Sequence, residues 1–249
     1  MYIKKTYITG NFIEIEKITT SRCKGKNVKR MPRMNPTPEN MKKVNERHAF
    51  KKLRRILNSN FDGDSYHVVA TYRPECRPES VEKAKKDMAK FWRQLKKFDK
   101  NVKYVAVAEH TQKGTIHFHM VIRVAASVKE IQSCWPHGFL NFRPLEENGD
   151  YEKLAWYLLK ESKQTYNDIN LRVFGKRWCE SKNLLHPEPK IEKIKADSWR
   201  EDPSCPKDYF VLSDSVEIGI SEVTGWPYQH YRCQKLGKEP DRLREGARC

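Results

Sequence analysis

The sequence lacks a long apolar run, a Cys-x-x-Cys pair and a glycine-rich phosphate-binding loop. Without an apolar run of about 20 residues we expect no membrane-spanning helix and no membrane partner. The first residues, Met1-Tyr-Ile-Lys-Lys, do not begin a secretory signal. The seven cysteines are scattered singly, and their odd number argues against a disulfide framework or a structural zinc site. These absences favour a protein that stays in a reducing cytoplasm.

Acidic residues are also scarce, most of all at the start of the chain. The sequence has 49 Lys and Arg against 32 Asp and Glu, a net charge of +17. Residues 1–60 alone hold sixteen Lys and Arg against four acids. Such an imbalance indicates a polyanionic partner, and contacts to phosphates would position the protein on nucleic acid without specifying its sequence.

The 249 residues, 38% of them apolar, are enough to bury one main domain with extensions. Residues 1–60 are predicted to be a basic N-terminal extension with an amphipathic helix over 39–57. Residues 61–165 contain the clearest periodic patterns and form the expected core. Residues 166–249 have many prolines and weak periodicity, which predicts an irregular C-terminal extension packed on the core, frayed after Lys235.

The core shows a regular alternation of strand and helix patterns. They predict a strand over 66–72, a helix over 79–98, strands over 104–109 and 115–122, a short helix near 127–134, a strand over 139–143 and a helix over about 150–163. The order β-α-β-β-α-β builds an antiparallel sheet with helices on one face, the split β-α-β or ferredoxin-like arrangement. We therefore predict an α+β fold, in which the last helix can cover the other face.

The strand over 115–122 carries two histidines around one bulky apolar residue. Alternate strand residues point to the same side, so His117 and His119 present both imidazoles together while Phe118 enters the core. Two convergent imidazoles beside a carboxylate are suitable ligands for a divalent metal ion. An exposed Glu–His pair that only decorates the sheet is the alternative.

The carboxylate comes from the preceding strand. A three-residue loop that ends in Gly114 suits a hairpin whose last residue is left-handed. This register sets Glu109 opposite His117, where paired Cβ atoms lie about 5 Å apart. Glu109 is the expected third ligand, whereas His110 would point to the opposite face.

The last core helix contains Leu154-Ala-Trp-Tyr157-Leu-Leu-Lys160. Tyr157 and Lys160 are three residues apart and share one helix face. A phenol is a poor nucleophile unless its oxyanion is stabilised, which a nearby ammonium group and a metal ion can do. Tyr157 could otherwise be one more aromatic residue of the core.

These motifs resemble the HUH endonucleases, specifically the rolling-circle replication-associated (Rep) proteins of bacterial mobile elements and phages. Three matches carry the resemblance. Val69-Ala-Thr-Tyr72 matches the first apolar strand motif, Glu109 with His117-Phe-His119 matches the metal motif, and Tyr157-Leu-Leu-Lys160 matches the nucleophile motif. The likeness covers about residues 40–165.

The resemblance implies an enzyme that nicks single-stranded or hairpin origin DNA in a bacterial host cytoplasm. Tyr157 would attack the scissile phosphate and leave a 5′-phosphotyrosine with a free 3′-hydroxyl that primes replication. Glu109, His117 and His119 would hold Mg²⁺ or Mn²⁺, and Lys160 would position the phosphate or stabilise charge.

One position departs from some relatives, which carry a second tyrosine one helical turn after the first. Position 161 is Glu161, so we predict a single-tyrosine enzyme. The missing Walker-type loop means that no helicase is attached, and strand unwinding would need a host helicase.

Two other functions remain open at this stage. The predicted topology also suits a nucleic-acid-binding module of the RNA-recognition type, without catalysis. A metal-dependent nuclease that uses activated water is the second alternative, and it would not need Tyr157.

Overall fold

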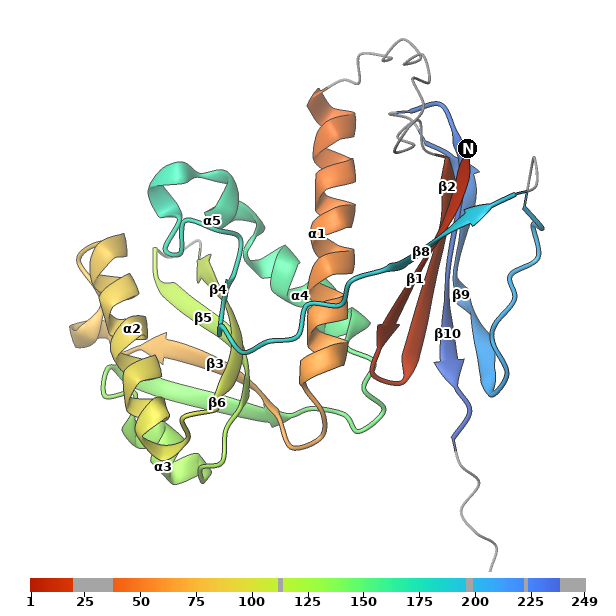
Figure 1. Cartoon of the computed structure of the whole chain (residues 1–249). Coiled ribbons are helices and arrows are strands. Elements are labelled where there is room, and N and C mark those ends of the chain that lie inside the picture. The colour runs from red at the N-terminus through yellow and green to blue at the C-terminus, as the bar shows by residue number, and fades with distance from the viewer. Residues whose placement is uncertain (20–37, 112–113, 196–198, 222–223, 238–249) are drawn as a thin grey trace, which may run out of the picture. The chain divides into compact units, whose positions relative to one another are not determined.

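The computed structural model describes residues 1–249 except 20–37, 112–113, 196–198, 222–223 and 238–249 (Figure 1). The chain divides into two compact units. Residues 42–187 form one of them, which we call the core unit. Residues 1–41 together with 188–249 form the other, which we call the sheet unit.

The core unit is built on a five-stranded antiparallel sheet. Its strands are β3 (Tyr66–Tyr72), β4 (Lys103–His110), β5 (Ile116–Arg123), β6 (Gly138–Pro144) and β7 (Cys179–Glu180). The strand order is β6-β3-β5-β4-β7, and all four pairings are antiparallel. With the short edge strand β7 set aside, this is the order that a split β-α-β string produces. The predicted α+β fold is confirmed.

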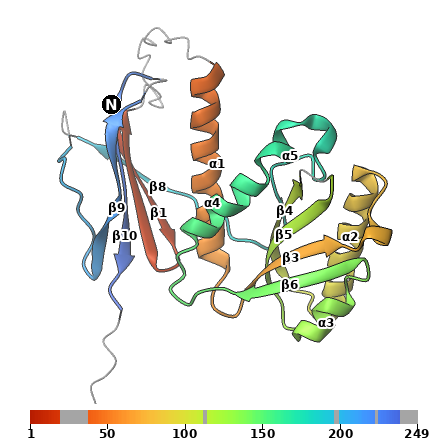
Figure 2. The same cartoon turned by 180° about the vertical axis from the view of Figure 1, so that it is seen from behind.

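Helices cover both faces of this sheet. They are α1 (Pro38–Asn60), α2 (Val81–Phe98), α3 (Val128–Ser133), α4 (Glu152–Glu161) and α5 (Lys163–Asn167), with short 3-10 turns at Pro74–Cys76 and Ile169–Leu171. Helices α2 and α3 pack on one face, around Phe91, Met120 and Ile131. Helices α1 and α4 pack on the other, around Leu57, Val107 and Leu158. Figure 2 shows this division from behind.

The helix starts explain why the segments fold locally as predicted. Helix α2 begins after Ser80, whose side chain accepts a hydrogen bond from the Lys83 amide. Helix α3 begins after Ser127 with a full capping box, in which Glu130 accepts from the Ser127 amide. Such caps satisfy amide groups that the first helical turn leaves unpaired. The predicted core elements are all present, with ends shifted by one to three residues.

The sheet unit holds the second five-stranded antiparallel sheet. Its strands are β1 (Tyr2–Thr9), β2 (Phe12–Thr19), β8 (Lys190–Ile194), β9 (Tyr209–Ile220) and β10 (Pro227–Lys235), in the order β8-β1-β2-β10-β9. The sequence predicts irregular structure for residues 190–235, but they supply three of these strands. Their partners β1 and β2 lie about two hundred residues away in sequence, so local periodicity carries little sign of the pairing.

Two cysteines of the sheet unit form a disulfide, Cys205–Cys233, although the sequence argues against a disulfide framework. The two Cα atoms lie 5.9 Å apart, within the range that a disulfide spans. Cys233 is fully buried on β10 beside Ile15 and Tyr231. The bond therefore fastens the segment that precedes β9 to one face of the sheet.

The observed division of the chain differs from the three predicted segments. Most of α1 lies in the core unit, because Leu53, Ile56 and Leu57 are buried against its sheet. Residues 166–187 also belong to that unit. Part of the predicted basic extension, residues 20–37, and the tail beyond residue 237 lie outside the described residues. None of the helices that the structure describes is long and apolar enough to cross a membrane.

Gly138, at the start of β6, has a close backbone neighbour that generates a prediction. A Cβ atom there would overlap the carbonyl oxygen of Thr71, an oxygen that also accepts a hydrogen bond from Trp135 Nε1. Gly138→Ala should lower the free energy of unfolding by about 1–3 kcal/mol or more, because β6 must move away from β3. Urea unfolding of the purified protein measures the loss. Gly237→Ala is the control, since no atom lies within 4 Å of that Cβ position, and equal stability of both variants would contradict the prediction.

Candidate functional site

One face of the core sheet carries the predicted site residues, and we call it the site face. Directly paired residues of antiparallel strands point to the same side, so the register orders this face into three rows. From β4 across β5 and β3 to β6, the first row is Glu109, His117, Thr71 and Phe139, the second is Val107, His119, Val69 and Asn141, and the third is Val105, Val121, His67 and Arg143. The predicted pairing of Glu109 with His117 is confirmed.

The hairpin that sets this register has the expected geometry at its described ends. The Thr111 amide donates to the Thr115 carbonyl at 2.8 Å. Gly114 has a φ of +72°, which a glycine adopts without steric cost. The turn therefore fixes which residues of β4 and β5 face each other.

Glu109 lies between the two histidines. Its Oε2 atom is 2.9 Å from Nε2 of His119 and 3.8 Å from Nδ1 of His117. The His119 side chain is almost fully buried, whereas Glu109 and His117 are partly open to solvent. The three residues that the sequence singled out as metal ligands are thus brought together, with one carboxylate oxygen shared between the imidazoles.

Tyr157 approaches the same cluster from α4. Its hydroxyl oxygen lies 3.5 Å from Nδ1 of His119, and its ring meets the His119 ring edge-on at 5.4 Å. The helix is held in this position because Ala155, Leu158 and Leu159 are buried against the site face. His119 therefore has Glu109 on one ring nitrogen and Tyr157 on the other.

Glu161 joins the cluster, and the sequence analysis missed it. One ligand atom each from Glu109, His119 and Glu161 lies within 4.8 Å of the other two, a group that could hold a metal ion. The signal was available, since Glu161 follows Tyr157 by four residues and such pairs share a helix face. Carboxylates with one or two imidazoles fit Mn²⁺ or Mg²⁺, which also take oxygen ligands from substrate phosphates.

The surroundings of Tyr157 oppose its ionisation. Burial raises the pKa of its phenol, and the negative charges of Glu161 and Glu109 raise it further. Arg143 acts in the opposite direction and lowers the same pKa. Arg143 stands on the edge strand β6 and is a second functional candidate that the sequence analysis did not find, because only the register of β6 brings it to this face.

His67 is a third residue that the motifs did not reveal. Its ring lies 6.0 Å from the His119 ring and 5.7 Å from the Tyr157 ring. Burial lowers the pKa of His67 to about 4, with the charges of His119 and Arg143 adding to the effect. Among the described residues its buried Nε2 atom has no hydrogen-bond partner. His67 is therefore a neutral side chain against which the Tyr157 ring packs.

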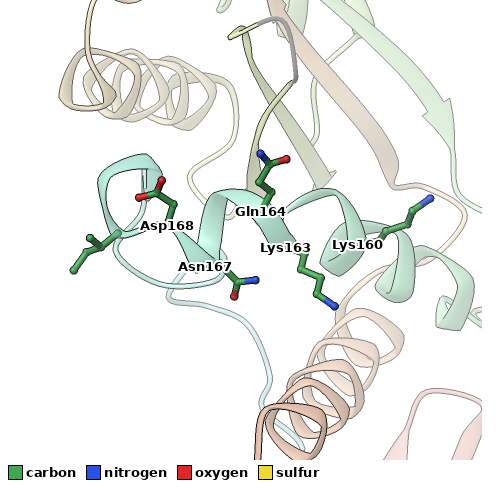
Figure 3. Close-up of a pocket in the computed structure, with 6 residues that line it drawn as sticks. Lys160, Lys163, Gln164, Asn167 and Asp168 are labelled. Carbon is green, nitrogen blue, oxygen red and sulfur yellow. The ribbon is translucent and has the colours of Figure 1, made fainter. Parts of the chain in front are cut away.

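Lys160 lies on the outer side of α4. Its Nζ atom is 5.6 Å from the ring centroid of Trp156, and both side chains are exposed. Lys160 also begins an open pocket along α4 and α5 (Figure 3). The residues that line the pocket are Lys160, Lys163, Gln164, Asn167, Asp168 and Ile169. This pocket lies beside the Glu109–His119 cluster rather than around it, and Lys160 is the predicted site residue that reaches it.

Other candidate residues point elsewhere. His110 lies beside the Leu171 backbone and Asp168, on the face opposite to Glu109, as the strand alternation predicted. The Tyr151 hydroxyl donates to the Glu146 carbonyl. The Tyr166 ring lies under the Arg172 guanidinium at 4.6 Å. Neither tyrosine takes the place of Tyr157 beside His119.

The sheet unit contains a second group of possible ligands, Glu14, Glu16 and His230. Nε2 of His230 lies 2.7 Å from Oε1 of Glu14, and both side chains are buried. His230 pairs with Glu16 across β2 and β10, which places the three side chains on one face. The sequence analysis left His230 without a partner because its neighbours come from the other end of the chain.

Comparison with known families points to the segment that contains the Tyr157 site. Residues 65–162 match the model of a family of replication-associated proteins, the ORF2 type. The match runs from the residue before β3 to the residue after α4. Over this segment the chain is similar to replication-associated proteins, which is consistent with a replication initiator. No curated protein and no solved structure matches the chain.

The low pKa of His67 generates a prediction on pH dependence. The unfolded chain binds a proton at His67 below its ordinary pKa of about 6.5, whereas the folded protein binds it only below about 4. Stability should therefore fall as the pH falls from about 6.5 to 4, by up to about 3 kcal/mol from this residue. His67→Asn should reduce that acid sensitivity, measured by urea unfolding in EDTA across this range.

The control is His186→Asn, which removes a histidine that is largely exposed. It should leave the acid sensitivity of the wild type intact. If His67→Asn and the wild type lose the same stability between these pH values, His67 does not carry the effect.

Proposed function

We propose that the core unit is a DNA-nicking and strand-transfer enzyme that initiates rolling-circle replication. The observation that carries the proposal is the contact chain from Glu109 through His119 to Tyr157, with distances of 2.9 Å and 3.5 Å. This chain lies inside the segment that is similar to replication-associated proteins. It joins a phenol that can act as nucleophile to a group that could hold a metal ion.

His119 orients the nucleophile. A neutral imidazole carries one proton, and the group bound to one ring nitrogen decides where that proton resides. When Nε2 is engaged as a ligand, Nδ1 carries the proton and can donate it in a hydrogen bond to the Tyr157 oxygen. The packing of the Tyr157 ring against His67 and His119 restricts its rotation. The phenolate oxygen is thereby held in one direction before the substrate arrives.

The ligands that we assign to the metal ion are Glu109, His117 and His119, with Glu161 as a further candidate. When bound, Mg²⁺ or Mn²⁺ withdraws charge from a phosphate oxygen and offsets the carboxylates that raise the Tyr157 pKa. Arg143 supplies part of the same positive charge from the protein itself. Lys160, one helical turn from Tyr157, would contact a phosphate further along the strand.

The transfer step balances without an external oxidant or energy source. The Tyr157 oxygen forms a bond to phosphorus, and the bond from phosphorus to the 3′ oxygen breaks. The phenol proton passes to solvent, and the departing 3′ oxygen takes up a proton. A later attack by a 3′-hydroxyl on the phosphotyrosine reverses these changes and rejoins the strand.

The expected partners follow from this chemistry. The substrate is single-stranded or hairpin origin DNA, and the enzyme works in the cytoplasm of a bacterial host. A host helicase would unwind the parental duplex. The single tyrosine means that each nicking event occupies the nucleophile until the strand is rejoined.

Covalent capture tests the proposal. Incubation with single-stranded origin oligonucleotides and Mn²⁺ should give a protein–DNA adduct that survives denaturing gel electrophoresis. Tyr157→Phe should abolish the adduct, because phenylalanine has no nucleophilic oxygen. Tyr166→Phe is the matched control and should form the adduct like the wild type.

The same experiment separates the alternative functions. Cleavage that persists in Tyr157→Phe would indicate a nuclease that uses activated water. Binding without an adduct, across a wide pool of hairpin oligonucleotides, would indicate a module without catalysis. Either result would contradict the nicking mechanism.

Metal removal gives an independent prediction. EDTA should abolish the adduct and Mn²⁺ should restore it. Glu109→Gln and His117→Ala should each weaken Mn²⁺ binding by about tenfold or more, measured by electron paramagnetic resonance titration. The salt-dependent affinity for DNA should remain, since it comes from Lys and Arg.

Two further variants sharpen the assignment. Glu161→Gln should also weaken Mn²⁺ binding if this carboxylate is a ligand. His110→Ala is the control, because His110 neighbours Glu109 in sequence but lies on the opposite face. Equal loss in the His110 and His117 variants would mean that the histidines act on folding rather than on the metal.

A further inference from the structure

The half of the site face next to strand β6 is open. Phe139, Asn141 and Arg143 occupy the β6 ends of the three rows, and all three side chains are exposed. By contrast, the half over β4 and β5 is buried under α1 and α4. The open half therefore continues the row of Glu109 and His117 outward to the edge of the sheet.

Phe139 is the most unusual residue of this surface. It is 67% exposed, which an aromatic side chain on a sheet face seldom is unless it binds something. It stands in the row of His117, two strand spacings or about 10 Å away. The Arg73 guanidinium lies 5.6 Å from its ring centroid. An exposed ring beside an arginine is the combination on which bases of a single strand stack.

Arg143 lies between this surface and the nucleophile. It is exposed, yet its charge lowers the pKa values of both Tyr157 and His67, so it faces the site from β6. A guanidinium in that position can contact a phosphate close to the scissile bond. The surface thus offers one aromatic ring and two arginines along a path that ends at Tyr157.

We propose that single-stranded DNA next to the nick site crosses strands β5, β3 and β6, with one base stacked on Phe139 and one phosphate bound by Arg143. The inference rests on the proposed function, because that function defines where the scissile phosphate lies. Positive charge at the β6 edge favours a nucleic acid strand over a neutral peptide strand at the same edge. Paired bases of a duplex cannot stack on the ring, so the surface selects unpaired DNA.

Binding of fluorescein-labelled oligothymidylate, followed by fluorescence anisotropy, tests this surface. The measurements use Tyr157→Phe as the parent protein, so that no covalent reaction contributes. Phe139→Ala should raise the Kd at least about fivefold, the loss expected for one base–aromatic stack. Phe139→Tyr should restore binding, since it keeps the ring. Thermal unfolding should be unchanged, because the side chain is exposed.

Matched controls come from α2, which packs on the opposite face. Phe98→Ala removes another exposed phenylalanine, 44% exposed, and should leave the Kd unchanged. Arg143→Gln should lower the slope of log Kd against log salt by about 0.7, the value for one phosphate contact to a single strand. Phe139→Ala and Arg93→Gln should leave that slope unchanged.

The outcomes separate this inference from the proposed function. Equal Kd values for Phe139→Ala and its parent would overturn the stacking site, even if the wild type forms the covalent adduct. An unchanged salt slope in Arg143→Gln would overturn the phosphate contact. Binding of a blunt duplex as tight as that of oligothymidylate would overturn the selection of unpaired DNA. Failure of the wild type to form any adduct would refute the nicking function alone, because the binding data do not require cleavage.

Discussion

The pairing register of β4 with β5 is the constraint on which the candidate site depends. Side chains alternate between the faces of a sheet, so a slip of one residue would send Glu109 or His117 to the opposite side. Two features hold the register: the left-handed Gly114 at the turn, and the buried side chains of Phe118 and Met120 on the other face. The hydrophobic core and the polar cluster are therefore two results of the same alignment.

Electrostatics gives the cluster its second property. Glu109 and Glu161 lie close together beside a half-buried phenol, and both raise its pKa. Carboxylates so near each other repel unless a cation lies near them. Arg143 offsets part of this charge but acts from the neighbouring edge strand. The arrangement is therefore suited to a bound divalent ion and an incoming phosphate, which bring charges of opposite sign to the same place.

Local patterns in the sequence are sufficient for the core sheet and for the first candidates. Helix α2 has a regular apolar stripe, and the hairpin that ends at Gly114 fixes the facing of Glu109 and His117. The remaining residues depend on contacts between distant segments. Arg143 and His67 meet Tyr157 only once β6 has paired with β3, and β9 and β10 find their partners at the start of the chain. Glu161 is predictable from its spacing to Tyr157, although its position by itself indicates only that a second tyrosine is missing.

The site face combines two surfaces with opposite requirements. Val105, Val107 and Val121 are buried under α1 and α4, which fixes Tyr157 against His119. The row ends at Phe139, Asn141 and Arg143 remain open, because β6 is an edge strand and no described helix of the core unit packs over them. A nucleophile must be held rigidly, whereas a flexible polymer needs an unobstructed path to it. In this sheet the same strands meet both needs, since the rows that carry the histidines extend without interruption onto the open surface.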